Sequence, residues 1–188
     1  MKKSIKSSAV YPMPVLMIAA YDENGVVDVM NAAWGTNCGM DKLCLFISEG
    51  HKTTQNILTT KAFTVSLADK AHMDVADYFG IATGNKMPDK FERTGYHATK
   101  SELVNAPVVE EFPLVMECEL LEVVRTDNIY AIIGKVVNTQ AEESVLDENG
   151  KVDTKKLNAI SFDQYTGGYY VTGDQVGKAW NAGKDLMK

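Results

Sequence analysis

Residues 113–142 read PLVMECELLEVVRTDNIYAIIGKVVNTQAE and contain two long runs rich in apolar and β-branched residues. The runs 113–127 and 129–142 meet at the polar stretch Thr126-Asp127-Asn128, which is typical of a hairpin turn. Two strands of this length in direct succession indicate antiparallel neighbours in a curved sheet or a barrel. This stretch therefore favours a mainly β fold.

The rest of the chain predicts further strands. Residues 14–30 form a second hairpin pattern, whose turn Asn24-Gly25 supplies the positive φ values that tight turns need. The short apolar run 43–48 is consistent with a strand buried on both faces. Residues 63–69 alternate between apolar and polar, and residues 167–173 form a last short strand. Strands are thus expected from one end of the chain to the other.

The predicted helices are short and lie between these strands, at 52–62, 72–84, 87–95 and 154–158. Thr53 or Thr54 is the expected N-cap of the first helix. The final stretch 175–188 is expected to be a helix or a tail. No repeat or linker divides the sequence, so we expect one domain over residues 1–188. The pattern predicts a β-barrel with short decorating helices rather than a doubly wound α/β sheet.

Composition and charge exclude several classes of function. The net charge is −6, with basic clustering only near the N-terminus, so nucleic-acid binding through a basic face is not expected. Apolar runs are too short to span a membrane, and no convincing signal-peptide pattern is present. Cys44 and Cys118 lie in apolar runs and are expected to be buried and reduced, whereas Cys38 is expected to be exposed. These features favour a cytoplasmic protein.

No strong catalytic or metal-binding motif is present, but two stretches suggest a ligand. Lys52, Thr53 and Thr54 stand at a predicted helix start, where free N–H groups and a lysine suit a phosphate. An ordinary capped helix would have the same pattern. Residues 30–40, MNAAWGTNCGM, have no regular periodicity and predict an irregular loop, in which small residues admit a planar ligand and Trp34 can stack on it. A plain loop with one partly buried tryptophan is the alternative. The two stretches are one strand apart, which favours a shared ligand at one barrel rim.

The order of several segments resembles the flavin reductase-like, FMN-binding split-barrel family, including its flavoredoxin-type members. The segments that carry the resemblance are PVLMIAAYDENGVVDVMNAAW (14–34), LCLFISEGHKTTQNILTTKAFTVSLAD (43–69), PDKFERTGYHATKSELVNAPVVEEFPLVMECELLEVV (88–124), IIGKVV (132–137) and GGYYVTGDQVG (167–177). The resemblance implies a split β-barrel that works as a homodimer, with one FMN per subunit near the dimer interface.

The resemblance also implies a set of cofactor-binding residues. The loop around the flavin ring and ribityl chain corresponds to Asn31, Ala32, Ala33, Trp34, Gly35, Thr36 and Asn37. The phosphate-binding turn corresponds to Lys52, Thr53 and Thr54, with Asn56 as a further candidate. Lys90 is expected to approach the flavin as a positive charge. Tyr165, Tyr169 or Tyr170 is expected to cover the ring, and Tyr169 is the candidate we carry forward.

An NAD(P)H-dependent oxidoreductase that reduces flavin and passes electrons to an acceptor is the leading functional expectation. The cofactor would carry the redox chemistry, so no catalytic side chain is expected. The alternative is a flavoredoxin-like electron carrier that holds FMN tightly, has no nicotinamide site and exchanges electrons with a redox partner protein. A third possibility is a barrel that binds another phosphate-bearing ligand or none.

Overall fold

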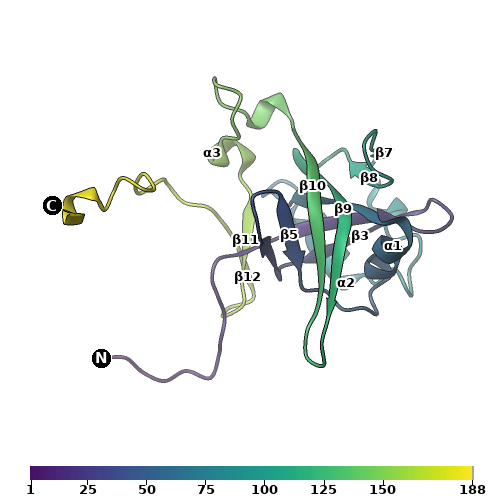
Figure 1. Ribbon diagram of the computed structural model, residues 1–188, viewed down its shortest axis with the longest axis horizontal. Helices are drawn as coiled ribbons and strands as arrows, with labels where there is room; N and C mark the ends of the chain where they lie inside the picture. The colour runs from purple at the N-terminus through teal and green to yellow at the C-terminus, as the bar shows by residue number, and fades with distance from the viewer. Residues whose placement is uncertain (188) are drawn as a thin grey trace.

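A computed structural model describes residues 1–187 and shows a mainly β chain built on a seven-stranded antiparallel sheet, which curls into a half-barrel (Figure 1). In spatial order its strands are β3 (Val27–Ala32), β2 (Leu16–Tyr21), β6 (Ala62–Leu67), β9 (Leu114–Arg125), β10 (Tyr130–Ala141), β5 (Lys42–Leu45) and β4 (Gly35–Asn37).

Two smaller sheets and a few short helices complete the fold. The smaller sheets are formed by β1 (Met13–Pro14), β11 (Ile160–Asp163) and β12 (Gly168–Val171), and by β7 (Ala98–Lys100) and β8 (Pro107–Val109). The helices are α1 (Lys52–Thr60), α2 (Met73–Ile81), α3 (Thr154–Leu157) and the 3₁₀ turns η1 (Glu92–Thr94), η2 (Glu143–Val145) and η3 (Lys184–Met187). The prediction of a mainly β fold with short helices is therefore confirmed.

Strand β2 is buried on both of its faces. Ile18 belongs to a core cluster with Phe63, whereas Met17, on the opposite face, belongs to a second cluster with Phe79 of α2. Because side chains alternate across a strand, a strand between two apolar layers needs apolar residues at every position. The continuous apolar run in the predicted hairpin 14–30 has this cause.

Strands β9 and β10 form the long antiparallel hairpin expected from the sequence, with Tyr130 opposite Arg125 and Ala141 opposite Leu114. Gly134 lies directly against Phe63, so that any side chain there would collide with the buried ring. The turn end of the β9–β10 hairpin projects away from the core, as Figure 1 shows. Its exposed apolar residues include Leu121 and Ile129.

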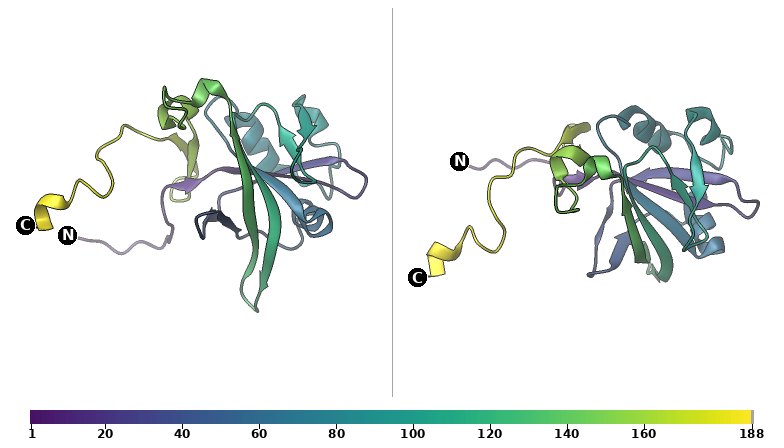
Figure 2. Two further views of the ribbon diagram at one scale, coloured as in Figure 1. Left: turned by 45° about the horizontal axis from the view of Figure 1, so that its top comes forward. Right: turned by 90° about the horizontal axis from the view of Figure 1, so that it is seen from above.

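Several local predictions need correction. His51, rather than Thr53 or Thr54, is the N-cap of α1, because the helix begins at Lys52. Strands β4, β7, β8 and β11 were not expected. Of the predicted C-terminal stretch, residues 175–187 form an exposed tail ending in η3, and Lys188 lies outside the described residues. Figure 2 shows that this tail and the N-terminal segment both extend away from the barrel.

The stretch 30–40 is also more regular than predicted. Its first residues complete β3, which ends at Ala32, and Gly35–Asn37 forms β4. Pairing with β5 places Gly35 opposite Leu45 and Thr36 opposite Cys44. The prediction of an irregular loop holds for residues 33–34 and 38–40 but was wrong for Gly35–Asn37, because backbone pairing with a later strand, rather than side-chain pattern, stabilises this short strand.

A substitution at Gly35 tests the assignment of this residue to the packed strand β4. An added Cβ would lie 2.5 Å from Leu16 Cδ1 and 2.9 Å from Leu45 Cδ2, so a larger residue here would have to displace two buried leucine side chains. We expect Gly35→Ala to lower the free energy of unfolding by about 1–3 kcal/mol, the usual effect of overpacking. Gly39→Ala is the matched control, because a Cβ there makes only ordinary contacts of 3.5 Å or more. Urea denaturation measures both, and equal stability of the two variants would contradict the assignment.

Candidate functional site

A cavity of about 360 Å³ lies where the end of β3 meets the segment after β5, helix α2 and the small sheet of β11 and β12. Its wall is mostly apolar and includes Ala32, Ala33, Ile47 and Phe162. Small side chains on one side and a phenylalanine on the other leave a space suited to a flat ring system. The sequence prediction that residues near position 33 face a ligand therefore corresponds to a real cavity wall.

Two hydrogen bonds to α2 hold the cavity walls together. Asn31 Nδ2 donates to the backbone oxygen of Ala76 at 2.9 Å, and the Tyr169 hydroxyl donates to Asp77 Oδ1 at 2.8 Å. Burial, together with the hydrogen bond to the Asp77 carboxylate, raises the pKa of Tyr169 to about 12. The tyrosine is therefore protonated at neutral pH and remains a donor. These bonds attach β3 and β12 to one helix.

Two aromatic side chains form the outer rim of this cavity. Trp34 and Phe46 both line it while each remains about half exposed, at 52% and 48%. The backbone N–H of Phe46 donates to the oxygen of Trp34 at 2.8 Å, which keeps the two residues side by side. Exposed aromatic rings at a cavity mouth can stack on a planar ligand.

A second cavity, of about 140 Å³, adjoins the first at the start of α1. The two share five lining residues, namely Met30, Asn31, His51, Gly80 and Ile81. Lys52, Thr53 and Lys90 line the second cavity only. A mostly apolar space thus leads into a smaller space that carries two lysines.

The start of α1 gives the second cavity the character of an anion site. The first-turn N–H groups of an α-helix have no intrahelical acceptor, and His51 at the N-cap provides no side-chain hydrogen bond to them. These donors, the positive end of the helix and the nearby lysines all favour a negatively charged group. Burial and the neighbouring Lys90 charge lower the pKa of His51, which keeps this histidine neutral at pH 7.

Lys90 is buried beneath this cavity and is ion-paired. Its Nζ lies 3.0 Å from Asp28 Oδ1, and the Thr53 hydroxyl donates to Asp28 Oδ2. Gly84 lies against the group, since an added Cβ would meet Asp28 Oδ1. The lysine predicted to approach the flavin as a positive charge is therefore held in place by a carboxylate, and its charge is partly compensated.

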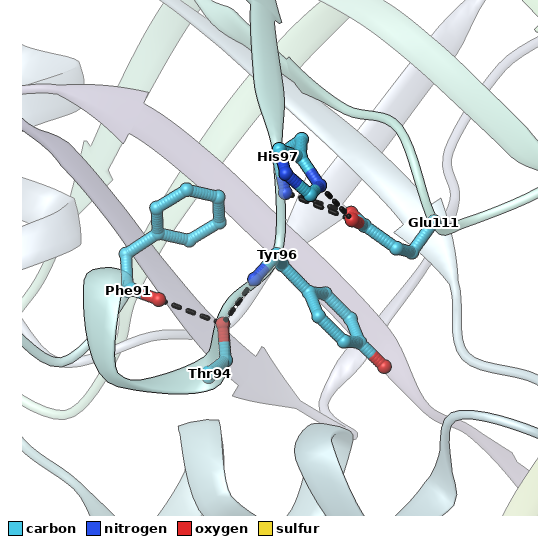
Figure 3. Close-up of polar contacts among 5 residues, drawn as sticks. All are labelled: Phe91, Thr94, Tyr96, His97 and Glu111. Atoms are coloured by element: carbon cyan, nitrogen blue, oxygen red, sulfur yellow. Dashed lines mark hydrogen bonds and ion pairs between the residues drawn. The ribbon is translucent and has the colours of Figure 1, made fainter.

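The segment that follows Lys90 is fixed by its own hydrogen bonds (Figure 3). The Thr94 hydroxyl donates to the backbone oxygen of Phe91 at 2.7 Å and accepts from the N–H of Tyr96 at 3.1 Å. The ring of Phe91 stacks on Phe79 of α2, with 6.2 Å between centroids. Because the next residue is anchored in the core, the backbone at Lys90 has little freedom to move.

The structure brings together most of the residues predicted from the sequence. Those that line the two cavities are Asn31, Ala32, Ala33, Trp34, Tyr169, Lys52, Thr53 and Lys90. Those outside both linings are Gly35, Thr36, Asn37, Thr54 and Asn56.

Residues in this second group have other surroundings. The Thr54 hydroxyl is fully buried and donates to the oxygen of Ser48 at 2.8 Å. Asn56 is buried in α1, and its Nδ2 has no partner within residues 1–187. Tyr165 and Tyr170 also lie elsewhere: the Tyr165 hydroxyl donates to the oxygen of Ala9, and the Tyr170 ring contacts Tyr11.

The cavity-wall residues that sequence reasoning missed include His51, Asp77, Phe46 and Phe162. Phe46 and His51 stand beside predicted features, and exposure of the phenylalanine could have been suspected from its place at a strand end. Asp77 and Phe162 carry no local signal, because only the tertiary fold brings α2 and β11 to β3.

A family model for the flavin reductase like domain matches residues 7–158, so this chain belongs to that family. Flavoredoxin of Desulfovibrio vulgaris (Miyazaki F) is 31% identical, with a TM-score of 0.92 over 97% of this chain and 100% of that one. A flavoredoxin from Methanosarcina acetivorans is 26% identical, with a TM-score of 0.88 over 100% of this chain and 99% of that one.

An FMN-binding protein from Thermus thermophilus is 20% identical and has a TM-score of 0.77 over 95% of this chain and 99% of that one, a likeness of fold. Similar likenesses to flavin reductase split barrels confirm the split-barrel prediction. The family match ends before β11, so Phe162 and Tyr169 lie outside the matched range.

Other predictions can be compared with the described residues. Cys44 and Cys118 are buried free thiols and Cys38 is exposed, as expected. Burial raises the pKa of Cys118 to about 12, so this thiol is unreactive. Within residues 1–187, no helix is long and apolar enough to cross a membrane. No cluster of three metal-ligating side chains occurs in the same range.

Proposed function

We propose that this protein binds FMN and works as an NAD(P)H-dependent oxidoreductase that passes electrons to an acceptor. The observation that carries the proposal is the pair of joined cavities, one mostly apolar and one lined by lysines at a helix start. FMN has the same division, because its isoalloxazine is flat and largely apolar while its phosphate is anionic. Membership of the flavin reductase like family supports this proposal.

The side chains present fit such a cofactor. Lys52 and the first-turn N–H groups of α1 would hold the phosphate. Asn56, the further candidate, lies one turn along α1 but lines neither cavity, so its unpartnered buried Nδ2 is not assigned to the phosphate. Gly84 packs against Lys52, since an added Cβ would lie 3.1 Å from the Lys52 side chain and a larger residue would displace it. The lysine and the helix start therefore support the phosphate assignment.

The chain's own residues would bind and orient the ring. Ala32 and Ala33 allow close approach to β3, and Trp34 would cover the exposed side of the cavity. The Tyr169 hydroxyl stays protonated and keeps the opposite wall attached to α2. When bound, FMN would supply the acceptor for a hydride from NADH or NADPH, so no side-chain nucleophile or base is required.

A flavoredoxin-like electron carrier is the second candidate. It is favoured by the likeness to two flavoredoxins, which covers nearly the whole of this chain and of theirs. In this version FMN is held tightly, no nicotinamide site is present, and electrons are exchanged with a redox partner protein.

We also infer a homodimer working in the cytoplasm. The aromatic rim of the first cavity and the apolar residues of the projecting β9–β10 hairpin are exposed, including Trp34, Phe46, Leu121 and Ile129. Apolar surface of this kind is typical of an interface between copies. Light scattering of the purified protein gives the oligomeric state directly.

Absorbance spectroscopy of the purified protein tests the proposed function. We expect a flavin spectrum after loading with FMN, and rapid bleaching when NADH or NADPH is added without oxygen. Bleaching by photoreduction but not by either nicotinamide would favour the electron carrier. Failure to take up FMN would reject both versions.

A further inference from the structure

The larger cavity of the candidate site has one negatively charged side chain on its wall. Asp77 of α2 is the only aspartate, glutamate, lysine or arginine among the described residues that line this cavity. The wall around it is mostly apolar and includes Ala33, Ile47 and Phe162. A charge beside an apolar cavity acts more strongly on a bound group than the same charge does in water. The proposed function uses this carboxylate only as an acceptor for Tyr169.

A neutral hydrogen-bond donor holds the Asp77 carboxylate in place. The Tyr169 hydroxyl donates to Asp77 Oδ1 at 2.8 Å. Burial and this hydrogen bond raise the pKa of Tyr169 to about 12, so the tyrosine is protonated and uncharged at neutral pH. The tyrosine therefore positions the carboxylate without cancelling its charge.

No cation of the described chain is paired with Asp77. Asp28 is paired with Lys90 at 3.0 Å, whereas no lysine, arginine or histidine within residues 1–187 forms an ion pair with Asp77. Asp77 is also only partly buried, so it can carry its charge without an opposite charge beside it. The wall of the larger cavity thus presents an uncompensated negative charge.

The basic residues of the candidate site do not offset this charge. Lys52 and Lys90 line the smaller cavity only. Lys90 is already paired with Asp28, and Lys52 stands where the anionic phosphate is proposed to bind. His51 lines both cavities, but burial and the Lys90 charge lower its pKa, so that it is neutral at pH 7. The charge next to the larger cavity is therefore that of Asp77.

A negative charge on this wall would act differently on the two redox states of a flavin. The oxidised isoalloxazine ring is neutral, and the addition of two electrons and one proton makes it an anion. A nearby carboxylate raises the free energy of the anion and leaves that of the neutral oxidised ring nearly unchanged. Reduced FMN would then be bound less tightly, relative to oxidised FMN, than in a cavity without the carboxylate.

We propose that Asp77 lowers the reduction potential of FMN bound in the larger cavity. This inference rests on the proposed binding of FMN. Asp77 acts through its charge and takes up neither an electron nor a proton. A lower potential makes reduced FMN a stronger donor, which favours transfer of its electrons to an acceptor.

Spectroelectrochemical titration of the FMN-loaded protein at pH 7 tests this proposal. Asp77→Asn keeps the size of the side chain and an acceptor for the Tyr169 hydroxyl but removes the charge. We expect the variant to bind reduced FMN, relative to oxidised FMN, about tenfold more tightly than the wild type does. For a two-electron couple this change raises the midpoint potential by about 30 mV. An unchanged or lower potential in Asp77→Asn would overturn the proposal.

Two control variants separate the charge of Asp77 from other effects. Asp74→Asn removes a charge from an exposed residue in the first turn of α2 that lines neither cavity, and it should change the relative affinity less than twofold. Tyr169→Phe removes the hydrogen bond but keeps the carboxylate, and it should not raise the potential. A rise in either control as large as that in Asp77→Asn would overturn the proposal.

Uptake of oxidised FMN distinguishes failure of this inference from failure of the proposed function. A wild-type protein that takes up no FMN rejects both. Uptake of FMN with equal potentials in the wild type and Asp77→Asn rejects this inference alone. If Asp77→Asn does not fold by circular dichroism, Asp77→Ser, which is smaller and also neutral, is expected to show the same rise, and an unchanged potential in that variant would overturn the proposal.

Discussion

Replacing Lys90 with methionine is expected to lower the free energy of unfolding by about 3 kcal/mol, because it leaves Asp28 buried without its cation. The two side chains are only 3% and 8% exposed, and their charged atoms lie 3.0 Å apart. Methionine has a similar length and an apolar stem, so the loss reports the missing charge rather than a large cavity. Urea denaturation of the flavin-free protein measures the effect.

A double variant and a neighbouring variant serve as controls. Lys90→Met combined with Asp28→Asn is expected to recover most of the stability, because no charge remains and the asparagine oxygen can still accept from Thr53. Arg93→Met, in the same segment, removes an arginine that is 56% exposed and paired with Asp89, so it should cost less than about 1 kcal/mol. Wild-type stability in Lys90→Met would contradict the buried ion pair.

Replacing Lys52 with alanine is expected to lower the affinity for FMN by about tenfold or more, because the variant loses a charge-assisted hydrogen bond to the phosphate. Lys52 lines the second cavity at the start of α1 and forms no ion pair with the other described residues. Its charge is therefore available to a ligand, unlike that of Lys90. Quenching of flavin fluorescence measures the affinity.

Riboflavin, which lacks the phosphate, provides the control for this variant. Its affinity should be the same in the wild type and in Lys52→Ala, because only the phosphate contact is removed. Lys70→Ala, which changes an exposed lysine outside both cavities, should leave FMN affinity unchanged. An equal loss of riboflavin and FMN affinity in Lys52→Ala would reject the phosphate assignment.

The long elements of this fold could be predicted from the sequence because their side-chain patterns are local. Strands β2, β9 and β10 carry apolar runs long enough to be recognised, and α1 and α2 show helical spacing between them. Strands β4 and β11 could not be predicted, because they have three and four residues and are stabilised mainly by pairing with distant segments.

The candidate site was predictable where it lies next to a recognisable element. Lys52 follows a predicted strand and opens a predicted helix, so it could be found from order alone, whereas Ala32 was assigned through the family resemblance. The pairing of Lys90 with Asp28 could not, since the two are far apart in the sequence and meet only after folding. Gly35 was assigned to the ligand, although contacts with Leu16 and Leu45 already account for glycine at that position.

The hydrogen bonds from Asn31 and Tyr169 to α2 join segments that are synthesised at different times, so the cavity is complete only after β12 has been made. A chain emerging from the ribosome presents β3 long before β12, which forms another wall of the cavity. Until then, Asp77 lacks its tyrosine partner and the larger cavity lacks one side. Stable capture of a ligand by this cavity must therefore follow synthesis of the barrel and cannot guide its earliest folding.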